Sequence, residues 1–342
     1  MKTDITKTRS QRSSGKHARL RRVLVTGGAG FIGSHTVEAL LRRGYAVRVL
    51  DDLSTGKAEN LPLEHARLEL RTGSILDRTE LDSAMQGIEG CIHLAAQVSA
   101  ARSVEEPLAS AERNVMGFIN VLEALRHHAV QPRLVFASSA AIYGEPRSLP
   151  LTEEAVASPT NPYGLEKYVD ELYADLYRRL HGVSSLGLRF FNVYGPRQDP
   201  SSSYSGVISR FIERIAAGET PTVFGDGRQT RDFIHVGDVA VAVATALDSD
   251  CNGACNVATG RRSDLLELLR LLGDCLGQAV RPQFEPARPG DIRDSCGDPA
   301  RLREQLGLVA GCSLEDGLAD LVASLSLPPP ALKRSGPRFA LP

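Results

Sequence analysis

The sequence predicts an α/β fold in which helices cover both faces of a parallel sheet. Short apolar runs recur over the first 190 residues, and segments with a helical spacing of apolar residues separate them. Strands that alternate with helices in this way form parallel sheets whose two faces are both buried. In chain order the expected strands and helices are 22–26, 31–43, 46–50, 91–95, 104–127, 133–137, 162–180 and 185–190.

A change of composition near residue 195 indicates a second, smaller domain. The segment 195–205 is polar and rich in Pro, Ser and Gly, as expected of a loop between domains. We assign residues 21–191 to the first domain, with 232–257 returning to it, and residues 192–231 and 258–327 to the second. The elements expected beyond the loop are helices at 207–217, 236–247, 264–275 and 314–324 and strands at 222–224 and 254–257.

Charge and composition disfavour several classes of protein. The 342 residues include 40 Lys and Arg against 41 Asp and Glu, so no overall positive field attracts nucleic acid or a membrane surface. Residues 1–20 are expected to be a disordered basic tail, and residues 328–342 a loose Pro-rich one. No apolar run reaches the ~18–20 residues of a membrane span, and the N-terminus lacks the apolar core of a signal peptide. Six cysteines without paired spacing predict reduced thiols, no metal site and a cytoplasmic protein.

A glycine-rich turn after the first strand indicates a dinucleotide site. In the spacing of Gly27, Gly30 and Gly33, the first glycine permits a tight turn, the second lets backbone approach pyrophosphate, and the third allows close helix–strand packing. An ordinary βα loop is the alternative. Asp51 and Asp52 follow the second strand, where a carboxylate binds ribose hydroxyls unless it merely caps the strand. Because a carboxylate there would repel a 2′-phosphate, the predicted cofactor is NAD and not NADP.

A phenol and an amine stand four residues apart on the expected helix 162–180. Tyr163 and Lys167 therefore share one helix face, and the ammonium would stabilise a phenolate whose pKa is ordinarily about 10. Tyr163 can then act as a general base. Ser138 and Ser139 end a strand at the edge of the sheet that would meet the ligand. Each motif alone also fits a surface pair or an ordinary strand end.

Together these motifs resemble the extended short-chain dehydrogenase/reductase family, and within it the nucleotide-sugar epimerases and dehydratases, over residues 22–325. The resemblance implies a Rossmann doubly wound sheet followed by a smaller C-terminal substrate-binding domain. It also implies a catalytic triad of Ser139, Tyr163 and Lys167, of which the last two also contact the cofactor. Family members commonly dimerise through the helices expected here at 104–127 and 162–180, so we expect a homodimer.

Further segments resemble the cofactor site of the family. Residues 93–97 match its H-x-A-A segment, and Asn114 matches an Asn of the long helix that holds backbone and water near the site. Ser74 stands where an Asp is usual, which implies a weaker hold on adenine. The other residues that the resemblance places around the cofactor are Phe31, Ile32, Ile75, Leu94, Ala95, Ala96 and Gln97.

Three segments of the second half resemble the diphosphate site of the family. They place Asn192, Arg231 and Arg288 against the substrate, where forked guanidiniums bind phosphate oxygens tightly. Taken singly, the arginines also fit surface ion pairs. The remaining substrate contacts that the resemblance implies are Val207, Thr222, Phe224, Asp291 and Ser295.

The residues after Ser139 indicate the type of reaction. Family dehydratases carry an Asp–Glu pair there, whereas this chain has Ala140 and Ala141, which cannot exchange protons. The resemblance therefore implies an NAD-dependent isomerase that inverts C4 of a UDP-hexose or UDP-N-acetylhexosamine through a 4-keto intermediate. The alternatives are a dehydratase, a reductase, an enzyme of UDP-uronates or dTDP-sugars, and a non-catalytic NAD-binding sensor. Ser295 takes the place of a bulky Tyr in epimerases restricted to plain hexoses, so we expect N-acetylated sugars to fit.

Overall fold

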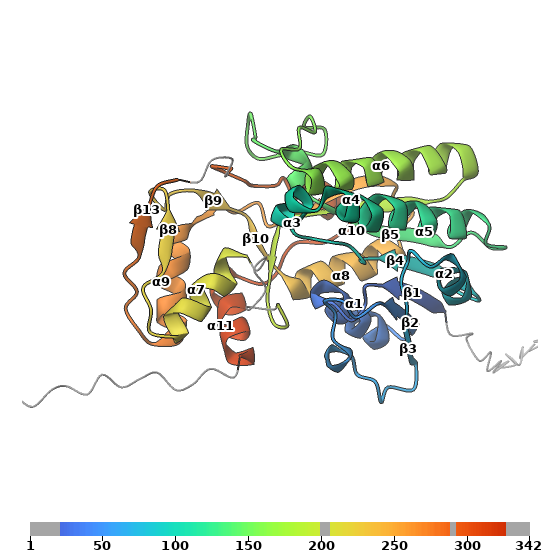
Figure 1. The fold of residues 1–342 in the computed structure, drawn as a ribbon, viewed down its shortest axis with the longest axis horizontal. Helices are drawn as coiled ribbons and strands as arrows, with labels where there is room; N and C mark the ends of the chain where they lie inside the picture. Colours follow the sequence, from blue (N-terminus) through green and yellow to red (C-terminus); the bar gives the residue numbers. More distant parts are fainter. Residues whose placement is uncertain (1–20, 199–205, 288–291, 326–342) are drawn as a thin grey trace, which may run out of the picture.

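Figure 1 shows the computed structural model, which describes residues 21–198, 206–287 and 292–325. The predicted tails and the predicted site residues Arg288 and Asp291 lie outside these ranges. The chain forms a larger lobe around the central sheet, here the sheet lobe, and a smaller lobe of helices and short strands, here the small lobe. Among the described helices, none combines the length and the hydrophobicity that crossing a membrane requires.

Seven parallel strands form the central sheet, in the order β11-β6-β5-β4-β1-β2-β3. The predicted doubly wound α/β fold is thus confirmed. Strand order reverses between β1 and β4, so the carboxyl ends of these strands border the crevice where such sheets bind ligands. The strands are β1(Arg22–Thr26), β2(Ala46–Asp51), β3(Leu68–Thr72), β4(Gly90–His93), β5(Arg133–Ser139), β6(Ser185–Phe190) and β11(Gly253–Val257).

One strand of the sheet has no counterpart among the expected strands. In β3, Glu69 and Arg71 alternate with apolar residues, so the segment lacks the continuous apolar run of the central strands. Its position at the edge of the sheet explains the difference, because an edge strand faces water along one side.

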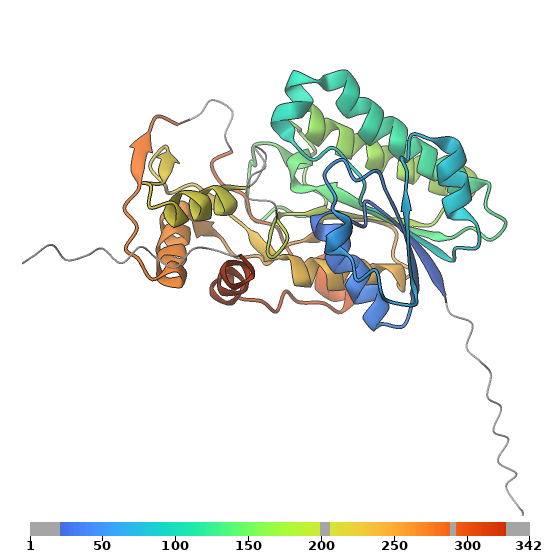
Figure 2. The same cartoon turned by 60° about the horizontal axis from the view of Figure 1, so that its bottom comes forward.

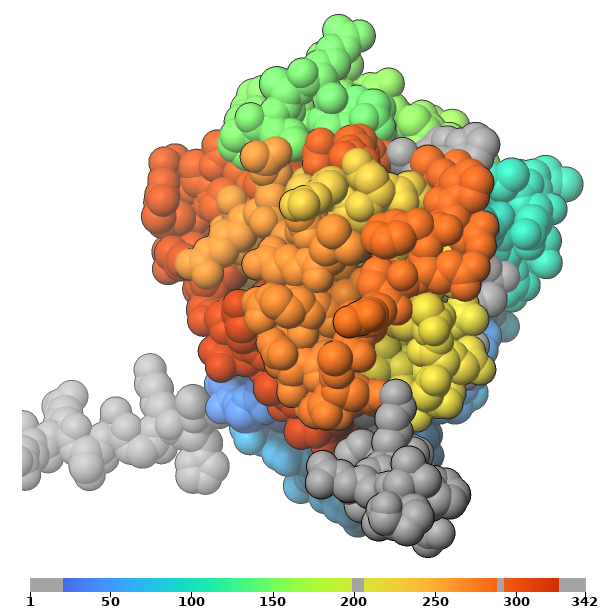
Figure 3. All heavy atoms as spheres, turned by 90° about the vertical axis from the view of Figure 1, so that its left-hand side faces the viewer, coloured from blue at the N-terminus to red at the C-terminus, as the bar shows by residue number. Residues whose placement is uncertain are grey.

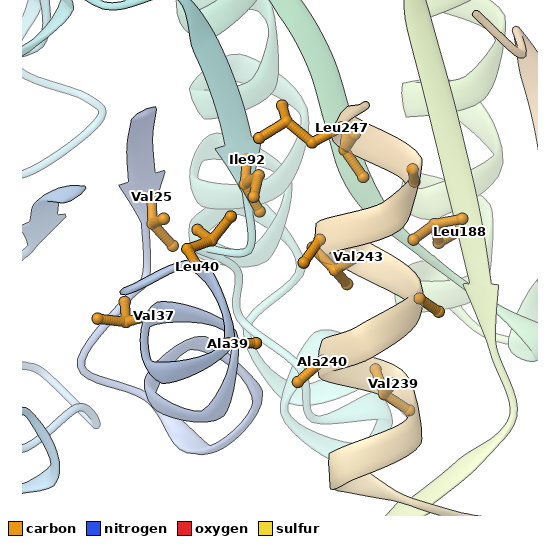
Figure 4. Close-up of a cluster of buried hydrophobic side chains, with 14 of the residues drawn as sticks. Val25, Val37, Ala39, Leu40, Ile92, Leu188, Val239, Ala240, Val243 and Leu247 are labelled. Atoms are coloured by element: carbon orange, nitrogen blue, oxygen red, sulfur yellow. The ribbon is translucent and has the colours of Figure 1, made fainter. Parts of the chain in front are cut away.

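Helices cover the two faces of the sheet, as Figure 2 shows. On one face, α1(Phe31–Arg42) and α8(Val236–Leu247) pack together, and their apolar side chains join those of the strands in one buried cluster (Figure 4). The cluster includes Val25, Leu40, Ile92, Val243 and Leu247. On the other face, α2(Arg78–Met85), α5(Gly117–Arg126) and α6(Pro162–His181) enclose a second cluster around Phe118 and Phe136.

The single helix expected at 104–127 is wrong. The structure divides this stretch into α3(Ala100–Glu105), α4(Pro107–Ala111), a π-helical turn η2(Glu112–Met116) and α5. Pro107 explains the first break, because proline lacks an N–H group and clashes with the preceding turn, yet fits the first position of α4. Two short 3-10 turns, η1(Ala58–Asn60) and η3(Ala140–Tyr143), complete this lobe.

The small lobe is built on three amphipathic helices. Its core is a cluster of buried side chains that includes Phe211, Leu268, Leu272 and Leu318. Figure 3 looks onto this lobe, whose surface comes mainly from the second half of the chain. The helices are α7(Val207–Ala216), α9(Leu265–Leu276) and α11(Leu314–Ser324). The paired short strands are β8(Thr222–Phe224) with β13(Gln283–Glu285), β9(Thr230–Arg231) with β12(Ser263–Asp264), and β7(Asn192–Tyr194) with β10(Phe233–His235).

The chain passes between the lobes more often than the sequence suggests. After the short strands that follow β6, it returns to the sheet lobe through α8 and β11. It returns once more in α10(Ala300–Leu306), where Leu302 and Leu306 join the cluster under α1 and α8. The range 258–327, which we assign to the second domain, thus includes a helix whose two buried leucines pack against the sheet lobe.

Candidate active site

The turn between β1 and α1 brings backbone close to the carboxyl ends of β1 and β4. Gly27 has φ +70°, and a Cβ atom there would lie 2.5 Å from the backbone N of Ala95. A Cβ atom at Gly33 would lie 2.0 Å from the carbonyl oxygen of Gly27, so only glycine permits this packing. No side chain caps α1 at Gly30. The first N–H groups of α1 therefore lack a side-chain partner, and this cradle fits the pyrophosphate of a dinucleotide.

The carboxylate of Asp51 is bound to backbone on both sides. It is buried, Oδ2 accepts from the Ala29 N–H at 2.9 Å, and Oδ1 accepts from the Leu53 N–H at 2.9 Å. Burial raises the pKa of Asp51, and these two hydrogen bonds oppose the rise. Asp52 is exposed and accepts from Ser54. Asp51 thus shapes the loop after β2, and each of its oxygens keeps a lone pair for a ribose hydroxyl.

The expected adenine side lies next to this loop. Ser74 is half-buried, and its hydroxyl accepts a hydrogen bond from the Leu76 N–H at 3.2 Å. Ile75 is buried in the cluster with α5, and Phe31 and Ile32 are half-buried in the first turn of α1. Ser74 and Ile75 follow β3 next to the end of β2, where the Gly73 N–H donates to the Asp51 carbonyl at 3.0 Å, and Ser74 supplies no charge.

A buried polar network holds the segment after β4. The Asn114 side chain donates to the Gln97 carbonyl at 2.9 Å and to Glu166 Oε2 at 2.6 Å, and its Oδ1 accepts from the Gln97 N–H at 2.7 Å. Glu166 also accepts from the Ser110 hydroxyl at 2.8 Å. Both ends of the Asn114 amide are therefore occupied by protein, and this residue joins the wall formed by Leu94, Ala95, Ala96 and Gln97 to α6.

His93 ends β4 beneath this wall. Its Nδ1 lies 2.8 Å from Thr26 Oγ1 on the neighbouring strand, and the ring is buried. Burial and, to a smaller extent, the charge of Lys167 lower the pKa of His93 to about 3. The imidazole is therefore neutral at physiological pH.

Of the two serines that end β5, only one is bound to a carboxylate. The Ser138 hydroxyl is buried and donates to Glu171 Oε1 at 2.5 Å. Ser139 is half-buried, and its oxygen accepts from the Ala141 N–H at 3.1 Å, which leaves its hydroxyl proton for another acceptor. Among the described residues, Ser139 therefore differs from Ser138 in that its hydroxyl proton is not bound to a carboxylate.

The start of α6 places Tyr163 beside this strand end. Asn161 caps the helix, its Oδ1 accepting from the Gly164 N–H at 2.9 Å, and Pro162 occupies the first turn. At Gly164 a Cβ atom would lie 2.6 Å from the Ala141 carbonyl oxygen, so α6 closely approaches the turn after Ser139. The predicted serine and tyrosine therefore lie on adjoining segments.

Lys167 is buried one turn further along α6. Its Nζ donates to Asp170 Oδ2 at 3.1 Å, and the two side chains are 2% and 1% exposed. Burial lowers the pKa of Lys167, but the charges of Asp170 and Tyr163 outweigh burial and raise it above its ordinary value. Tyr163 thus lies near enough to influence the ammonium electrostatically.

A second buried ion pair lies behind Ser138. Arg189 on β6 forms two hydrogen bonds with Glu171, Nε to Oε1 at 2.9 Å and Nη2 to Oε2 at 2.7 Å. Arg189 also donates to the Tyr143 hydroxyl at 2.9 Å. This pair joins α6 to β5 and β6 directly behind the serines.

The predicted substrate residues lie on the small lobe and its connections. Arg231 and Ser295 are neighbours: the Ser295 N–H donates to the Thr230 carbonyl at 3.1 Å, and Arg231 Nη1 donates to the carbonyls of Thr230 and Arg293 at 2.8 and 3.3 Å. Asn192 is exposed at the start of β7. Val207, Thr222 and Phe224 are half-buried in α7 and β8.

Asp232, next to Arg231, has a different environment. Its carboxylate is fully buried and accepts hydrogen bonds from Thr259, Gly260 and Gly297 at 2.7 to 3.2 Å. Asp232 therefore joins its own segment to two others, one at Thr259–Gly260 and one at Gly297. Among the described residues, no group of three His, Cys, Asp or Glu side chains gathers as metal ligands, and all six cysteines are free.

Sequence reasoning missed the buried carboxylates Glu166, Asp170 and Glu171. Two signals were present. Arg189 lies within an otherwise apolar strand and needs a buried counter-ion, and Asp170 follows Lys167 at the i,i+3 spacing that brings two helical side chains together. For Glu166 the sequence holds no such signal, because its partners, Ser110 of α4 and Asn114 of η2, come from a distant part of the chain.

Comparisons with known proteins agree with this geometry. The model of the NAD dependent epimerase/dehydratase family matches residues 23–258. The UDP-glucose 4-epimerase of Mycolicibacterium smegmatis is 38% identical over 308 residues, which cover 88% of this chain and 97% of that protein. A solved UDP-N-acetylglucosamine 4-epimerase from Methanobrevibacter ruminantium, in complex with UDP-N-acetylmuramic acid, matches with a TM-score of 0.86 and 36% identity over 89% of this chain and 98% of that one. The Thermus thermophilus UDP-glucose 4-epimerase in complex with NAD matches with a TM-score of 0.81 and 40% identity, over the same shares of the two chains. The chain belongs to the NAD-dependent epimerase/dehydratase family.

Proposed function

We propose that this protein is an NAD-dependent isomerase that inverts C4 of a UDP-hexose or UDP-N-acetylhexosamine. The observation that carries the proposal is the juxtaposition of Tyr163 and a buried Lys167 with Ser139 at the carboxyl edge of the sheet, beside the glycine cradle. Relatives and solved neighbours named as UDP-glucose and UDP-N-acetylglucosamine 4-epimerases support the substrate class.

Each member of the proposed triad has one task. Tyr163, as phenolate, takes the proton of the sugar 4-hydroxyl, and the Lys167 ammonium stabilises the phenolate. Ser139 donates a hydrogen bond to the same sugar oxygen. A bound NAD would supply a reversible hydride acceptor for C4, so that the overall reaction would involve no net oxidation. Tyr163 then returns its proton to the oxygen at C4, and inversion needs only that the sugar turn between the two transfers.

The turn after Ser139 favours isomerisation over dehydration. Removal of water needs an acid and a base beside the sugar, and Ala140 and Ala141 of η3 provide neither. Arg231 is our candidate for binding the diphosphate, and Ser295, its neighbour, leaves room for a 2-acetamido group. Arg288 and Asp291, outside the described residues, are proposed from their sequence motif alone.

A homodimer is part of the proposal. Apolar side chains remain exposed along α6, where Leu172, Leu176 and Leu180 follow each other at helical spacing and are 52%, 37% and 66% exposed. Leu108 of α4, 87% exposed, lies among the helices on the same side of the sheet. An apolar stripe of this kind suits a second copy of the same face. Light scattering should give a dimer for the wild type and a monomer for Leu172→Glu/Leu176→Glu, with Val241→Glu, exposed on α8, as the control that stays dimeric.

The proposal also covers the cellular location and the kinds of partner. We propose that the enzyme works in the cytoplasm, where its six free thiols stay reduced, without nucleic-acid or membrane partners.

Product analysis tests the function directly. Purified protein is incubated with UDP-glucose, UDP-N-acetylglucosamine, UDP-glucuronate and dTDP-glucose, and products are identified by mass and NMR. We expect C4 epimers of unchanged mass from the UDP-hexoses. Loss of water would identify a dehydratase, and NAD binding without turnover on any substrate would identify a sensor. Tyr163→Phe should lose at least a hundredfold in kcat while still binding NAD, whereas Tyr173→Phe, which packs against the second core cluster on α6, should keep its activity.

A further inference from the structure

We infer that Asp170 is a positioning residue of the proposed reaction: its carboxylate holds the Lys167 ammonium charged and in a fixed place beside Tyr163. The inference rests on the proposed function and adds to it a residue that sequence reasoning did not single out. Asp170 does not touch the reacting atoms, so it acts only through Lys167.

The geometry requires a counter-ion at this point. Lys167 is 2% exposed, and an isolated ammonium so far from water would be strongly disfavoured. Asp170 Oδ2 lies 3.1 Å from Nζ and is 1% exposed, so the carboxylate shares the same dry environment. An ammonium has three donors, and this bond uses one, which leaves two for other acceptors such as the phenolate.

Stability alone does not account for the pair. Replacing a buried ion pair by apolar side chains is often neutral or stabilising, so burying these two charges costs free energy that a purely structural contact would avoid. Asp170 Oδ1 is itself buried without a hydrogen-bond partner among the described residues. The fold thus holds the Asp170 carboxylate in an unfavourable environment, and the result is that Lys167 stays charged.

The other charged groups around Lys167 do not replace Asp170. On α6, Glu166 is committed to Ser110 and Asn114, and Glu171 to Arg189 and Ser138. From β4, His93 faces Lys167 as a neutral ring, because burial and the lysine keep its pKa near 3. Tyr163 is the remaining ionisable group facing the ammonium. Among the described residues, Asp170 is therefore the carboxylate in contact with Nζ.

Lysine NMR provides a measurement independent of turnover. The chain contains only six lysines, so the ¹³Cε signal of Lys167 can be assigned by its absence in Lys167→Arg. The wild type and Asp170→Asn are titrated from pH 6 to 11, each with and without NAD. We expect Lys167 to lose its proton at least one pH unit lower in Asp170→Asn. The alkaline limb of the kcat profile should move in the same direction by a similar amount.

Two further variants keep the test decisive. Asp175→Asn removes an exposed carboxylate from the same helix and should change neither curve. Asp170→Ser repeats the loss of charge with a smaller side chain, in case Asp170→Asn does not fold. An unchanged Lys167 titration in a folded variant would overturn the inference, even if the enzyme is an epimerase. A wild type without epimerase activity would overturn the proposed function. The NMR titration would still test whether Asp170 keeps Lys167 protonated, because it does not depend on turnover.

Discussion

Replacing Glu171 by Gln should show how strongly the site depends on one buried ion pair. The substitution keeps the shape of the side chain and removes its charge, which leaves the Arg189 guanidinium buried without its two-point partner. Breaking a buried pair in this way costs about 3–5 kcal/mol in the free energy of unfolding. At roughly 2 °C per kcal/mol for a large domain, Tm should fall by about 6–10 °C.

The surface of the same helix offers a matched control. Asp175 also binds two arginines, Arg178 at 2.7 Å and Arg179 at 3.0 Å, but its side chain is 47% exposed, against 9% for Glu171. Because water screens that cluster, Asp175→Asn should change stability by less than about 1 kcal/mol.

A double-mutant cycle by urea unfolding completes the assay. We compare Glu171→Gln, Arg189→Met and the double variant with the wild type. The sum of the two single losses in the free energy of unfolding should exceed the loss in the double variant by at least about 2 kcal/mol. Additive losses, or a Glu171→Gln variant as stable as Asp175→Asn, would refute the reasoning. The kcat of the single variants should also fall, since the pair supports the strand that ends in Ser139.

Three further predictions concern the cofactor and substrate sides. The pKa of His93 is about 6.5 in the unfolded chain but about 3 in the folded protein. Below pH 6.5 only the unfolded chain binds this proton, so the stability present above pH 6.5 is lost as the pH falls. Between pH 7 and pH 5 the free energy of unfolding in urea should therefore fall by about 2 kcal/mol, and His93→Gln should reduce this loss. Glu166→Ala leaves the Asn114 amide and the Ser110 hydroxyl without their acceptor, which should cost about 1–3 kcal/mol in thermal unfolding and weaken NAD binding several-fold by calorimetry. Ser295→Tyr should lower kcat/KM for UDP-N-acetylglucosamine at least tenfold and spare UDP-glucose.

Controls separate these outcomes from general damage. Glu166→Gln keeps an acceptor oxygen for Asn114 and should retain most of the NAD affinity. Ser295→Thr adds little volume and should keep both substrates. Full turnover of the N-acetylated sugar by Ser295→Tyr, or an acid sensitivity that His93→Gln leaves unchanged, would contradict the corresponding argument.

The sequence predicts best what rests on continuous local patterns. The strands at 22–26 and 185–190 and the helix at 236–247 agree with the structure at both ends, because each is a clean apolar pattern between turn residues. The glycine turn and the Tyr163–Lys167 spacing were likewise readable, since turn geometry and helix period fix them. In the structure the glycine turn packs against Ala95 after β4, and the start of α6 packs against Ala141 after β5.

The parts that escaped prediction depend on contacts between distant segments. The charged residues of β3 hide the apolar pattern by which a strand is recognised in the sequence. Helix α10 packs on the sheet although it follows the small lobe in the sequence. Buried Glu166 reads as an ordinary helix-surface residue until the π-helical turn brings Asn114 against it. Such side chains are polar in sequence and interior only in the fold, and a composition pattern cannot distinguish them from solvated ones.

The buried hydrogen bonds of Asp232 have a consequence for how the protein unfolds. The buried carboxylate of Asp232 binds its own passage of the chain between the lobes to two others, at Thr259–Gly260 and at Gly297, so the lobes cannot separate while these hydrogen bonds persist. Heat should therefore melt both lobes in a single calorimetric transition, with a van't Hoff enthalpy equal to the measured one. In Asp232→Asn, where the carboxylate is lost, we expect the small lobe to melt first and the endotherm to divide in two.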